Sequence, residues 1–329
     1  MTSSDPVRWG VLSTAAINDL VLEGARTSDR VDVVAVASRD GSRAERYARD
    51  KGIDRAHGSY EGLLEDPDVE AVYVSLPNAL HVPWTLRALE AGKHVLCEKP
   101  LSRRAEQAAE AFDAADRADR LLMEAFMYRH NPQTRRLREL LDAGAVGRPA
   151  LVRAAFAFAM TDADTNVRNQ AELEGGALMD VGCYCVSGAR LVAGEPERVQ
   201  GHAVVGPHGV DLRFAGVMAM PEEVIATFDC GILGLGDRDE LEVVGDEGSL
   251  FLDDPWHCRA PVIEHRRAGD TQRIELERAD SYRLELENLG AAIRGEAEPL
   301  LGRDDAVAQA RVVEALYRSA GEGRAVSPI

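Results

Sequence analysis

The chain has 329 residues, 45% of them hydrophobic and 29% charged, which is typical of a globular protein with a sizeable core. Its formal net charge is -18 and no basic run is present, so we expect no nucleic-acid partner. The polar first residues and the lack of a long apolar run predict neither a signal peptide nor a membrane span. The five cysteines have no framework spacing and indicate a reducing cytoplasm. We expect no metal site, because Cys183 and Cys185 would face different ways on a helix.

The first part of the chain alternates apolar runs with helical patterns. Val7–Leu12 predicts a buried strand, and Ala15–Arg26 predicts the helix that follows it. The same alternation predicts strands over 31–38, 71–76, 93–97 and 121–124, and helices over 42–51, 79–90 and 105–115. Repeated strand–helix units of this kind predict a doubly wound parallel α/β sheet.

The turn after the first strand keeps the spacing of the dinucleotide-binding fingerprint. Ser13, Ala15 and Asn18 stand where its three glycines would be, and small residues let the backbone approach a pyrophosphate. Such a degenerate match would also suit any tight strand-to-helix turn. The residues that we assign to the cofactor from this region are Gly10, Ser13, Thr14, Ala15 and Ile17.

The tip of the second strand carries Ser38, Arg39 and Asp40. In a nucleotide-binding fold this tip meets the adenosine ribose, where an acid accepts from a 2′-hydroxyl and an arginine can hold a 2′-phosphate. Ser38 and Arg39 therefore favour NADP, although Asp40 leaves NAD possible and Arg39 could be a solvated surface residue. Further cofactor residues are expected after the third predicted strand, namely Leu76, Pro77, Asn78 and His81, the last on the cofactor side or as a cap.

The fourth predicted strand runs into Glu98-Lys99-Pro100. Proline keeps the residue before it out of the helical region, so Lys99 should be extended just past the carboxyl end of a strand, where doubly wound sheets bind ligands. Lysine occurs only at 51, 93 and 99 in a chain that otherwise uses arginine. A compact, titratable ammonium suits proton chemistry, whereas a solvent-facing lysine is the alternative. We assign Glu98 and Lys99 to the cofactor site, and Lys99 is a candidate for catalysis.

The pattern changes after Tyr128, where alternating segments indicate antiparallel strands with one solvated face. Strands are expected over 150–159, 199–205, 210–218, 224–230, 241–244 and 249–252, and helices over 132–143, 176–192, 282–294 and 304–320. We therefore expect a dinucleotide-binding domain over 1–127 and a substrate-binding and oligomerisation domain over 128–329.

Asp180 and Tyr184 are four residues apart on the predicted helix 176–192 and should share one face. An acid and a phenol near a lysine from the other domain form a plausible proton-handling trio. By spacing alone, an aspartate paired with a surface arginine and a tyrosine packed in the core would be the usual interpretation.

Three motifs together resemble the Gfo/Idh/MocA oxidoreductases: Gly10-x-x-Ser13-x-Ala15, Glu98-Lys99-Pro100 and Asp180-x-x-x-Tyr184. The segments Phe126–Pro132, Asn166–Arg168 and Gly175–Tyr184 are most similar to the D-xylose dehydrogenase and trans-dihydrodiol dehydrogenase branch. The resemblance implies a Rossmann domain and a C-terminal α+β domain with a large open, mostly antiparallel sheet. It also implies that the exposed face of this sheet forms a homodimer or homotetramer.

The same resemblance implies NADP-dependent hydride transfer to or from a sugar, such as D-xylose or glucose, or a related diol. Lys99, Asp180 and Tyr184 would be catalytic: Tyr184 takes the hydroxyl proton, Lys99 stabilises the alkoxide and lowers the pKa of Tyr184, and Asp180 binds a substrate hydroxyl. The pocket candidates are Tyr128, Asn166, Arg168 and Trp256. A keto-sugar nucleotide reductase, a cofactor-retaining NAD-dependent glycosidase and a cofactor-binding sensor remain alternatives.

Overall fold

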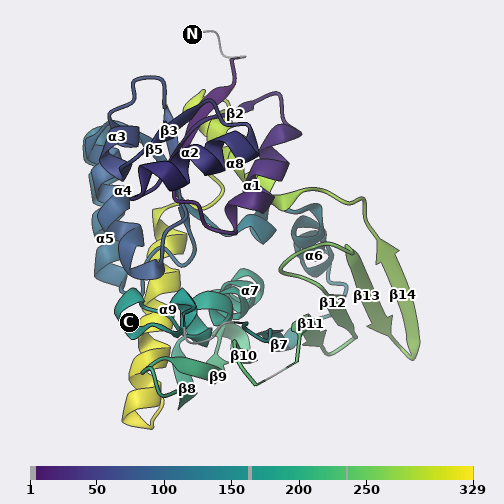
Figure 1. Ribbon diagram of the computed structural model, residues 1–329. Helices are drawn as coiled ribbons and strands as arrows, with labels where there is room; N and C mark the ends of the chain where they lie inside the picture. Colours follow the sequence, from purple (N-terminus) through teal and green to yellow (C-terminus); the bar gives the residue numbers. More distant parts are fainter. Residues whose placement is uncertain (1–4, 162–164, 235, 329) are drawn as a thin grey trace. The chain divides into compact units, whose positions relative to one another are not determined.

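The computed structural model describes residues 5–161, 165–234 and 236–328, and its chain divides into two compact units (Figure 1). The first unit extends to Ser102 and also includes Glu106–Met127 and Asp280–Ala306. The second comprises Arg103–Ala105, Tyr128–Ala279 and the chain from Val307 onward. The expected domains are 1–127 and 128–329, and the units differ from these mainly in that 280–306 lies in the first unit.

The first unit contains a six-stranded, wholly parallel sheet in the order β3-β2-β1-β4-β5-β6, which confirms the predicted Rossmann fold. Its strands are β1 (Val7–Leu12), β2 (Val31–Ala37), β3 (Arg55–His57), β4 (Ala71–Val74), β5 (His94–Glu98) and β6 (Leu122–Ala125). Most of their residues are buried, as expected for a parallel sheet covered on both faces. The sequence analysis missed β3, because this strand has only three half-buried residues.

Six helices have all or most of their length in this unit (Figure 1). They are α1 (Asn18–Arg26), α2 (Gly41–Lys51), α3 (Tyr60–Leu64), α4 (His81–Glu90), α5 (Ala105–Ala118) and α8 (Ser281–Ile293). Helix α8 belongs here because it packs against α1: a Cβ on Gly24 would lie 2.8 Å from the backbone nitrogen of Arg283. Periodicity within α8 could not reveal a partner 260 residues away in the chain.

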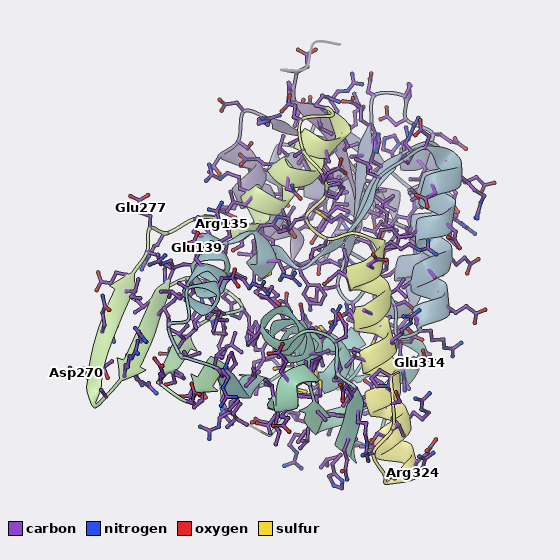
Figure 2. The ribbon with its side chains drawn as sticks, turned by 180° about the vertical axis from the view of Figure 1, so that it is seen from behind. Arg135, Glu139, Asp270, Glu277, Glu314 and Arg324 are labelled. Carbon is purple, nitrogen blue, oxygen red and sulfur yellow. The ribbon has the colours of Figure 1, made fainter. Side chains whose placement is uncertain are left out.

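The second unit is built on an eight-stranded sheet in the order β14-β13-β12-β11-β7-β10-β9-β8. Its strands are β7 (Pro149–Ala157), β8 (Arg198–Val205), β9 (Asp211–Ala219), β10 (Ile225–Gly231), β11 (Arg238–Gly245), β12 (Ser249–Asp253), β13 (Val262–Arg267) and β14 (Asp270–Glu275). All neighbours pair antiparallel except β7 and β10, which confirms the mostly antiparallel sheet. The sequence analysis missed β13 and β14, whose side chains are mostly polar. The exposed Asp270, the first residue of β14, follows their hairpin turn (Figure 2).

The helices of the second unit are α6 (Pro132–Asp142), α7 (Cys183–Ala193) and most of α9 (Arg303–Glu322). A π-helical turn, Leu178–Gly182, leads directly into α7. Helix α7 packs against one face of the sheet, where a Cβ on Gly188 would lie 2.6 Å from the indole ring of Trp256.

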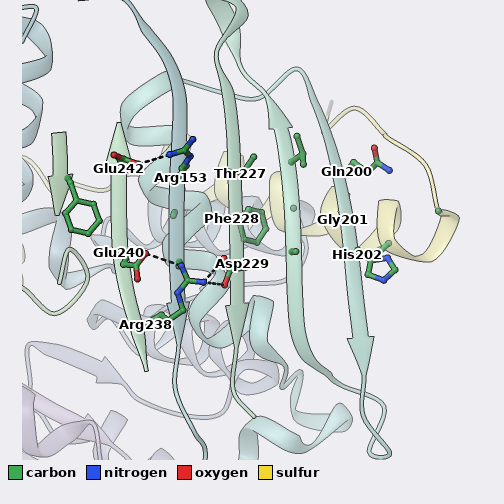
Figure 3. Close-up of a pocket in the computed structure, with 18 residues that line it drawn as sticks. Arg153, Gln200, Gly201, His202, Thr227, Phe228, Asp229, Arg238, Glu240 and Glu242 are labelled. Atoms are coloured by element: carbon green, nitrogen blue, oxygen red, sulfur yellow. Dashed lines mark hydrogen bonds and ion pairs between the residues drawn. The ribbon is translucent and has the colours of Figure 1, made fainter. Parts of the chain in front are cut away.

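The other face of this sheet, which we call the open face, carries polar and apolar side chains (Figure 3). Arg153 pairs with Glu242 at 3.0 Å, and Arg238 pairs with Asp229 and Glu240 at 3.0 and 3.1 Å. A shallow depression of about 710 Å³ runs along it. In the described part of the chain, every helix is too short or too polar to cross a membrane.

Candidate functional site

Because the six strands of the first sheet are parallel, the loops after β1, β2, β4 and β5 open at one edge, which we call the carboxyl edge. The turn after β1 is held by side chains where the fingerprint has glycines. Ser13 has a φ of 131°, and its hydroxyl lies 2.9 Å from both the carbonyl and the hydroxyl of Ser75. Asn18 donates to the Ser13 carbonyl at 2.9 Å. Hydrogen bonds thus hold a backbone shape that glycine adopts without strain.

Gly10 lies within β1 rather than in this turn, and its role toward the cofactor stays a prediction. A Cβ there would lie 2.7 Å from Leu63 of α3 and 3.1 Å from Val69. The glycine therefore permits close packing of α3 on the sheet. The spacing of the motif alone could not show whether a glycine is needed here for this packing or for contact with a cofactor.

Two arginines gather at the adjoining part of the carboxyl edge. Arg39, after β2, is exposed and hydrogen-bonds Tyr60, and Arg43 of α2 reaches the Thr14 carbonyl at 3.5 Å. Burial raises the pKa of Tyr60, and the positive charges of Arg39 and Arg43 act in the opposite direction. Sequence reasoning missed Arg43, although it lies only four residues after Arg39, on the first turn of the next helix.

Asp40 has a structural role at the same edge. Its carboxylate accepts from the backbone N–H groups of Ser42 and Arg43, and so caps α2. Its hydrogen bonds with Ser42 and Arg43 hold the pKa of this carboxyl below its usual value. Asp40, the acid that left NAD possible in the sequence analysis, therefore caps the start of α2.

His81 joins the loops that follow β4 and β5. Its ring nitrogens lie 2.8 Å from the Pro100 carbonyl and 2.7 Å from the Leu76 carbonyl. Burial lowers the pKa of His81 to about 4, so at neutral pH the ring is neutral and donates to one carbonyl at a time. Both nitrogens contact backbone carbonyls, one of them in the loop that carries Lys99, and the role of His81 toward the cofactor stays a prediction.

Glu98 and Lys99 are both half-buried at the end of β5. The hydroxyl of the buried Tyr73 donates to Glu98. Glu285 of α8 is completely buried, and neither of its oxygens has a hydrogen-bond partner among the residues that the structure describes. Burial, together with the negative charges of Glu98 and Asp280, holds the pKa of Glu285 well above its usual value. A buried acid with a raised pKa therefore lies in the field of Glu98.

The other two lysines have structural partners. The buried Lys93 donates to the carbonyl oxygens of Asp66 and Val69 at 2.7 and 2.8 Å, and Lys51 pairs with Asp19 at 2.7 Å. Lys99 is thus the one lysine that stands directly after a strand at the carboxyl edge.

In the second unit, Asp180 is held by Arg168. The Arg168 Nε donates to the Asp180 carboxylate at 2.7 Å, and the two side chains are 43% and 14% exposed. Asn166 accepts from the Arg168 backbone N–H at 3.1 Å and so shapes the turn that presents this guanidinium. A Cβ on Gly175 would lie 2.3 Å from the Arg168 carbonyl, so the glycine permits this close approach. The Asn166 side chain therefore holds the backbone at Arg168, whereas Arg168 and Asp180 form the charged pair.

Asp180 lies in the π-helical turn, whereas Tyr184 lies in α7. The expectation that they share one face assumed α-helical spacing, and the wider π turn changes the angle between them. Asp211 of β9 fixes the start of this turn, because its carboxylate accepts from the Leu178 N–H at 2.7 Å and from the Tyr317 hydroxyl at 2.8 Å. Burial raises the pKa of Asp211 to about 6. Sequence reasoning missed this residue, which looked like one polar position in an alternating strand.

The ring of Tyr184 lies among aromatic side chains. Its centroid is 5.3 Å from that of Phe156, 5.8 Å from Tyr128 and 6.1 Å from Trp256. Tyr128 and Trp256 are buried, and their polar atoms contact Ser187 at 2.7 Å and the Ala155 carbonyl at 3.0 Å. Both pocket candidates therefore help to orient Tyr184, and their role toward a substrate stays a prediction. Phe156 was not singled out in the sequence, where it reads only as part of an apolar strand.

Comparisons with known proteins agree with both units. Residues 7–126 match a family model described as an oxidoreductase family with an NAD-binding Rossmann fold, and residues 134–251 match the GFO/IDH/MocA C-terminal domain. A D-xylose 1-dehydrogenase (NADP+) from Haloferax volcanii is 37% identical, over 97% of this chain and 98% of its own. A trans-1,2-dihydrobenzene-1,2-diol dehydrogenase from Danio rerio is 35% identical, over 78% and 76%.

A solved structure of similar fold is KijD10, a 3-ketoreductase from Actinomadura kijaniata in complex with NADP and TDP-benzene. It is 31% identical, with a TM-score of 0.90 over 95% of this chain and 98% of its own. The compared proteins thus act on sugars, a diol or a keto-sugar nucleotide, and KijD10 binds NADP.

The raised pKa of Glu285 has a measurable consequence for stability. Above the unfolded pKa of about 4.3, the unfolded chain releases a proton that the folded state holds more tightly, so this residue's contribution to the free energy of unfolding should fall as pH rises. Glu285→Gln removes this titration and should gain stability relative to wild type as the pH rises above about 4.3. The measurement is urea unfolding across this range, with the exposed helical Glu110→Gln as control. A Glu285→Gln difference that stays constant with pH would contradict the assignment.

Proposed function

The chain belongs to the Gfo/Idh/MocA oxidoreductase family, and from this premise we propose that it transfers a hydride between NADP and a sugar, as an aldose dehydrogenase. The observation that supports the substrate class most directly is the surroundings of Tyr184, where a charged pair and aromatic rings occur together. The Arg168–Asp180 pair suits sugar hydroxyls, and the rings suit the apolar faces of a sugar. The similarity to a D-xylose dehydrogenase over almost the whole chain supports the same class.

The carboxyl edge has the features that a dinucleotide needs. The guanidinium groups of Arg39 and Arg43 suit a 2′-phosphate, and the small residues Ser13 and Ala15 suit a pyrophosphate. Hydrogen bonds connect the neighbouring loops of this edge: Ser13 bonds Ser75, and His81 bonds the carbonyls of Leu76 and Pro100. Thr14, Ile17, Ser38, Pro77, Asn78 and Glu98 complete the proposed cofactor residues. NADP, when bound, supplies the hydride acceptor or donor.

The chain's own residues would handle the proton. Tyr184 takes the proton of the substrate hydroxyl during oxidation and returns it during reduction. The ammonium of Lys99 stabilises the negative charge that develops on the substrate oxygen. Asp180, oriented by Arg168, accepts a hydrogen bond from a second hydroxyl and so fixes which carbon reacts.

The function is tested with purified enzyme and a panel of aldoses, polyols and trans-diols, by nicotinamide absorbance at saturating NADP. We expect oxidation of pentoses or hexoses at the anomeric carbon, with D-xylose and D-glucose among the substrates. If every free sugar is inert while a keto-sugar nucleotide is rapidly reduced, the aldose assignment is wrong.

Reduction of a keto-sugar nucleotide has its own support, because the fold match to the 3-ketoreductase KijD10 reaches a TM-score of 0.90. A cofactor-retaining glycosidase would instead release free sugar from a glycoside without net change in NADP. The same panel, extended by a TDP-keto-sugar and a nitrophenyl glycoside, separates the three activities.

Cofactor choice should depend on the two arginines. Arg39→Ala should weaken NADP binding by about 1.5–3 kcal/mol, the range for a charge-assisted hydrogen bond, with little change for NAD. Arg43→Ala should act in the same direction. Arg49→Ala, at the other end of α2, is the control for a lost positive charge. Equal losses for NADP and NAD, measured by fluorescence titration, would show that these arginines do not bind the phosphate.

Proton transfer should depend on Tyr184. Tyr184→Phe should lower turnover by roughly 10²–10⁴-fold, the usual worth of one proton-transfer group, with NADP binding intact. The oxidation rate of the wild type should rise with pH, and Lys99→Met should move that rise upward because the nearby positive charge is gone. Near-normal turnover of Tyr184→Phe beside an inactive Lys99→Met would instead make Lys99 the acid and base.

We also propose a homodimer or homotetramer that uses the open face. Val217 and Ile225 are 49% and 48% exposed there, and large apolar side chains on a sheet face favour association. Light scattering at micromolar concentration should give at least a dimer, and Val217→Glu should shift the mass downward. Leu20→Glu on α1, at a similarly exposed apolar side chain, is the control. A monomeric wild type would contradict the proposal.

The five cysteines support the cytoplasmic location that the sequence analysis predicted. All of them are buried as free thiols, and burial raises the pKa of Cys97, Cys185 and Cys230. A thiol count of five on the unfolded protein, isolated under conditions that prevent reduction, is the expected result. Disulfide-linked fragments would argue for an oxidising compartment.

A further inference from the structure

The loop after β12 holds His257 in a fixed orientation. The His257 Nδ1 lies 2.5 Å from the carboxylate of Asp239 and 3.7 Å from that of Asp254. Asp254 has a φ of 117° and accepts from the backbone N–H groups of Arg259 and Ala260. Asp239 also accepts from the Trp256 backbone N–H at 3.1 Å. A non-glycine residue with such a φ persists only where the surrounding contacts enforce it.

These contacts determine which nitrogen of His257 can bind a ligand. A ring nitrogen that faces two carboxylates carries the proton, so Nδ1 donates to Asp239. This leaves Nε2, which has no partner in the part of the chain that the structure describes. The side chain of His257 is 35% exposed.

Asp239, Asp254 and His257 could in principle hold a metal ion, because their ligand atoms lie within 4.8 Å of one another. The guanidinium of Arg259 already lies 3.3 Å from Asp254 and 3.9 Å from Asp239. It supplies positive charge to both carboxylates, and so favours an ion-pair network that orients His257.

His257 and Tyr184 contact the same ring. The Phe156 centroid is 5.3 Å from His257 and 5.3 Å from Tyr184, and both contacts are edge-to-face. The register supports this placement, because Asp239 of β11 pairs with Phe156 of β7. Two residues further along, Phe158 lies 5.7 Å from the Arg168 guanidinium. Accessible polar groups therefore stand beside successive aromatic residues at the end of β7, next to Tyr184.

We propose that His257 is a substrate-binding residue whose Nε2 hydrogen-bonds a sugar hydroxyl remote from the reacting carbon. The inference rests on the proposed aldose dehydrogenase function. Tyr184 and His257 contact one shared aromatic ring, and we therefore assign to His257 the hydroxyl across the sugar ring from the anomeric carbon. In a pyranose, that hydroxyl is the one on C4.

This assignment predicts discrimination between sugars that differ only at C4. A site that hydrogen-bonds one hydroxyl favours the epimer that presents it, because the other epimer leaves the His257 Nε2 without this bond. D-Xylose and L-arabinose are such a pair, and so are D-glucose and D-galactose. His257→Ala should remove most of the difference in kcat/KM within each pair.

The experiment measures kcat and KM for the four sugars with wild type, His257→Ala, His257→Gln and the control His202→Ala on the open face. We expect wild type to prefer one epimer at least tenfold, and His257→Ala to bring the ratio near one, mainly through KM. His257→Gln, whose amide reaches the position of Nε2, should restore part of the preference. NADP affinity should be unchanged in every variant, which shows that the fold is kept.

Two results would overturn the assignment while leaving the dehydrogenase in place: a wild type that does not distinguish the epimers, or a preference that survives in His257→Ala. A wild type that is inert on all four sugars would overturn the proposed function, and this assignment with it. Whether the wild type oxidises any of the four sugars therefore distinguishes failure of the His257 assignment from failure of the proposed function.

Discussion

All six strands of the first sheet run in one direction, so every loop that follows a strand opens at the same edge. The other features of the cofactor site follow from this constraint. It brings the tip of β2, with Arg39, and the turn after β1 to one edge, and it brings Lys99 to that edge from β5. The hydrogen bonds of Ser13 with Ser75, and of His81 with the Leu76 and Pro100 carbonyls, connect neighbouring loops along it. Ser13 and Lys99, 86 positions apart in the chain, thus belong to one surface.

In the second unit, the corresponding physical constraint is that polar groups must be held near a buried phenol. Tyr184 is only 6% exposed and lies against Phe156, Tyr128 and Trp256. The polar atoms near it are fixed by specific partners, Asp180 by Arg168 and the Leu178 N–H by Asp211. Two glycines permit this arrangement, since a Cβ on Gly175 would meet the Arg168 carbonyl and one on Gly176 would meet Asp211. Aromatic rings and a charged pair thus occur together around Tyr184.

The features that sequence reasoning predicted are those with a local cause. Buried strands such as β1 and β4 are short apolar runs, and Pro100 predicts an extended Lys99. The features that it missed depend on contacts distant in sequence. Gly10 is a glycine because of Leu63, and α8 belongs to the first unit because of α1. His257 reads as an isolated histidine until β11 brings Asp239 beside it. Asp180 pairs with Arg168, as the interpretation from spacing alone would have it, whereas the π turn around it has no signal in the sequence.

The central claim is that Lys99 and Tyr184 act on the same substrate oxygen, although they belong to different units of the chain. A double-mutant cycle on the oxidation of the best aldose substrate tests it most directly. Residues that act as a unit are strongly non-additive, so Lys99→Met and Tyr184→Phe combined should reduce turnover little further than the more damaging single change. Losses that multiply, with NADP affinity intact in all variants, would mean that the two residues act independently and would contradict this account.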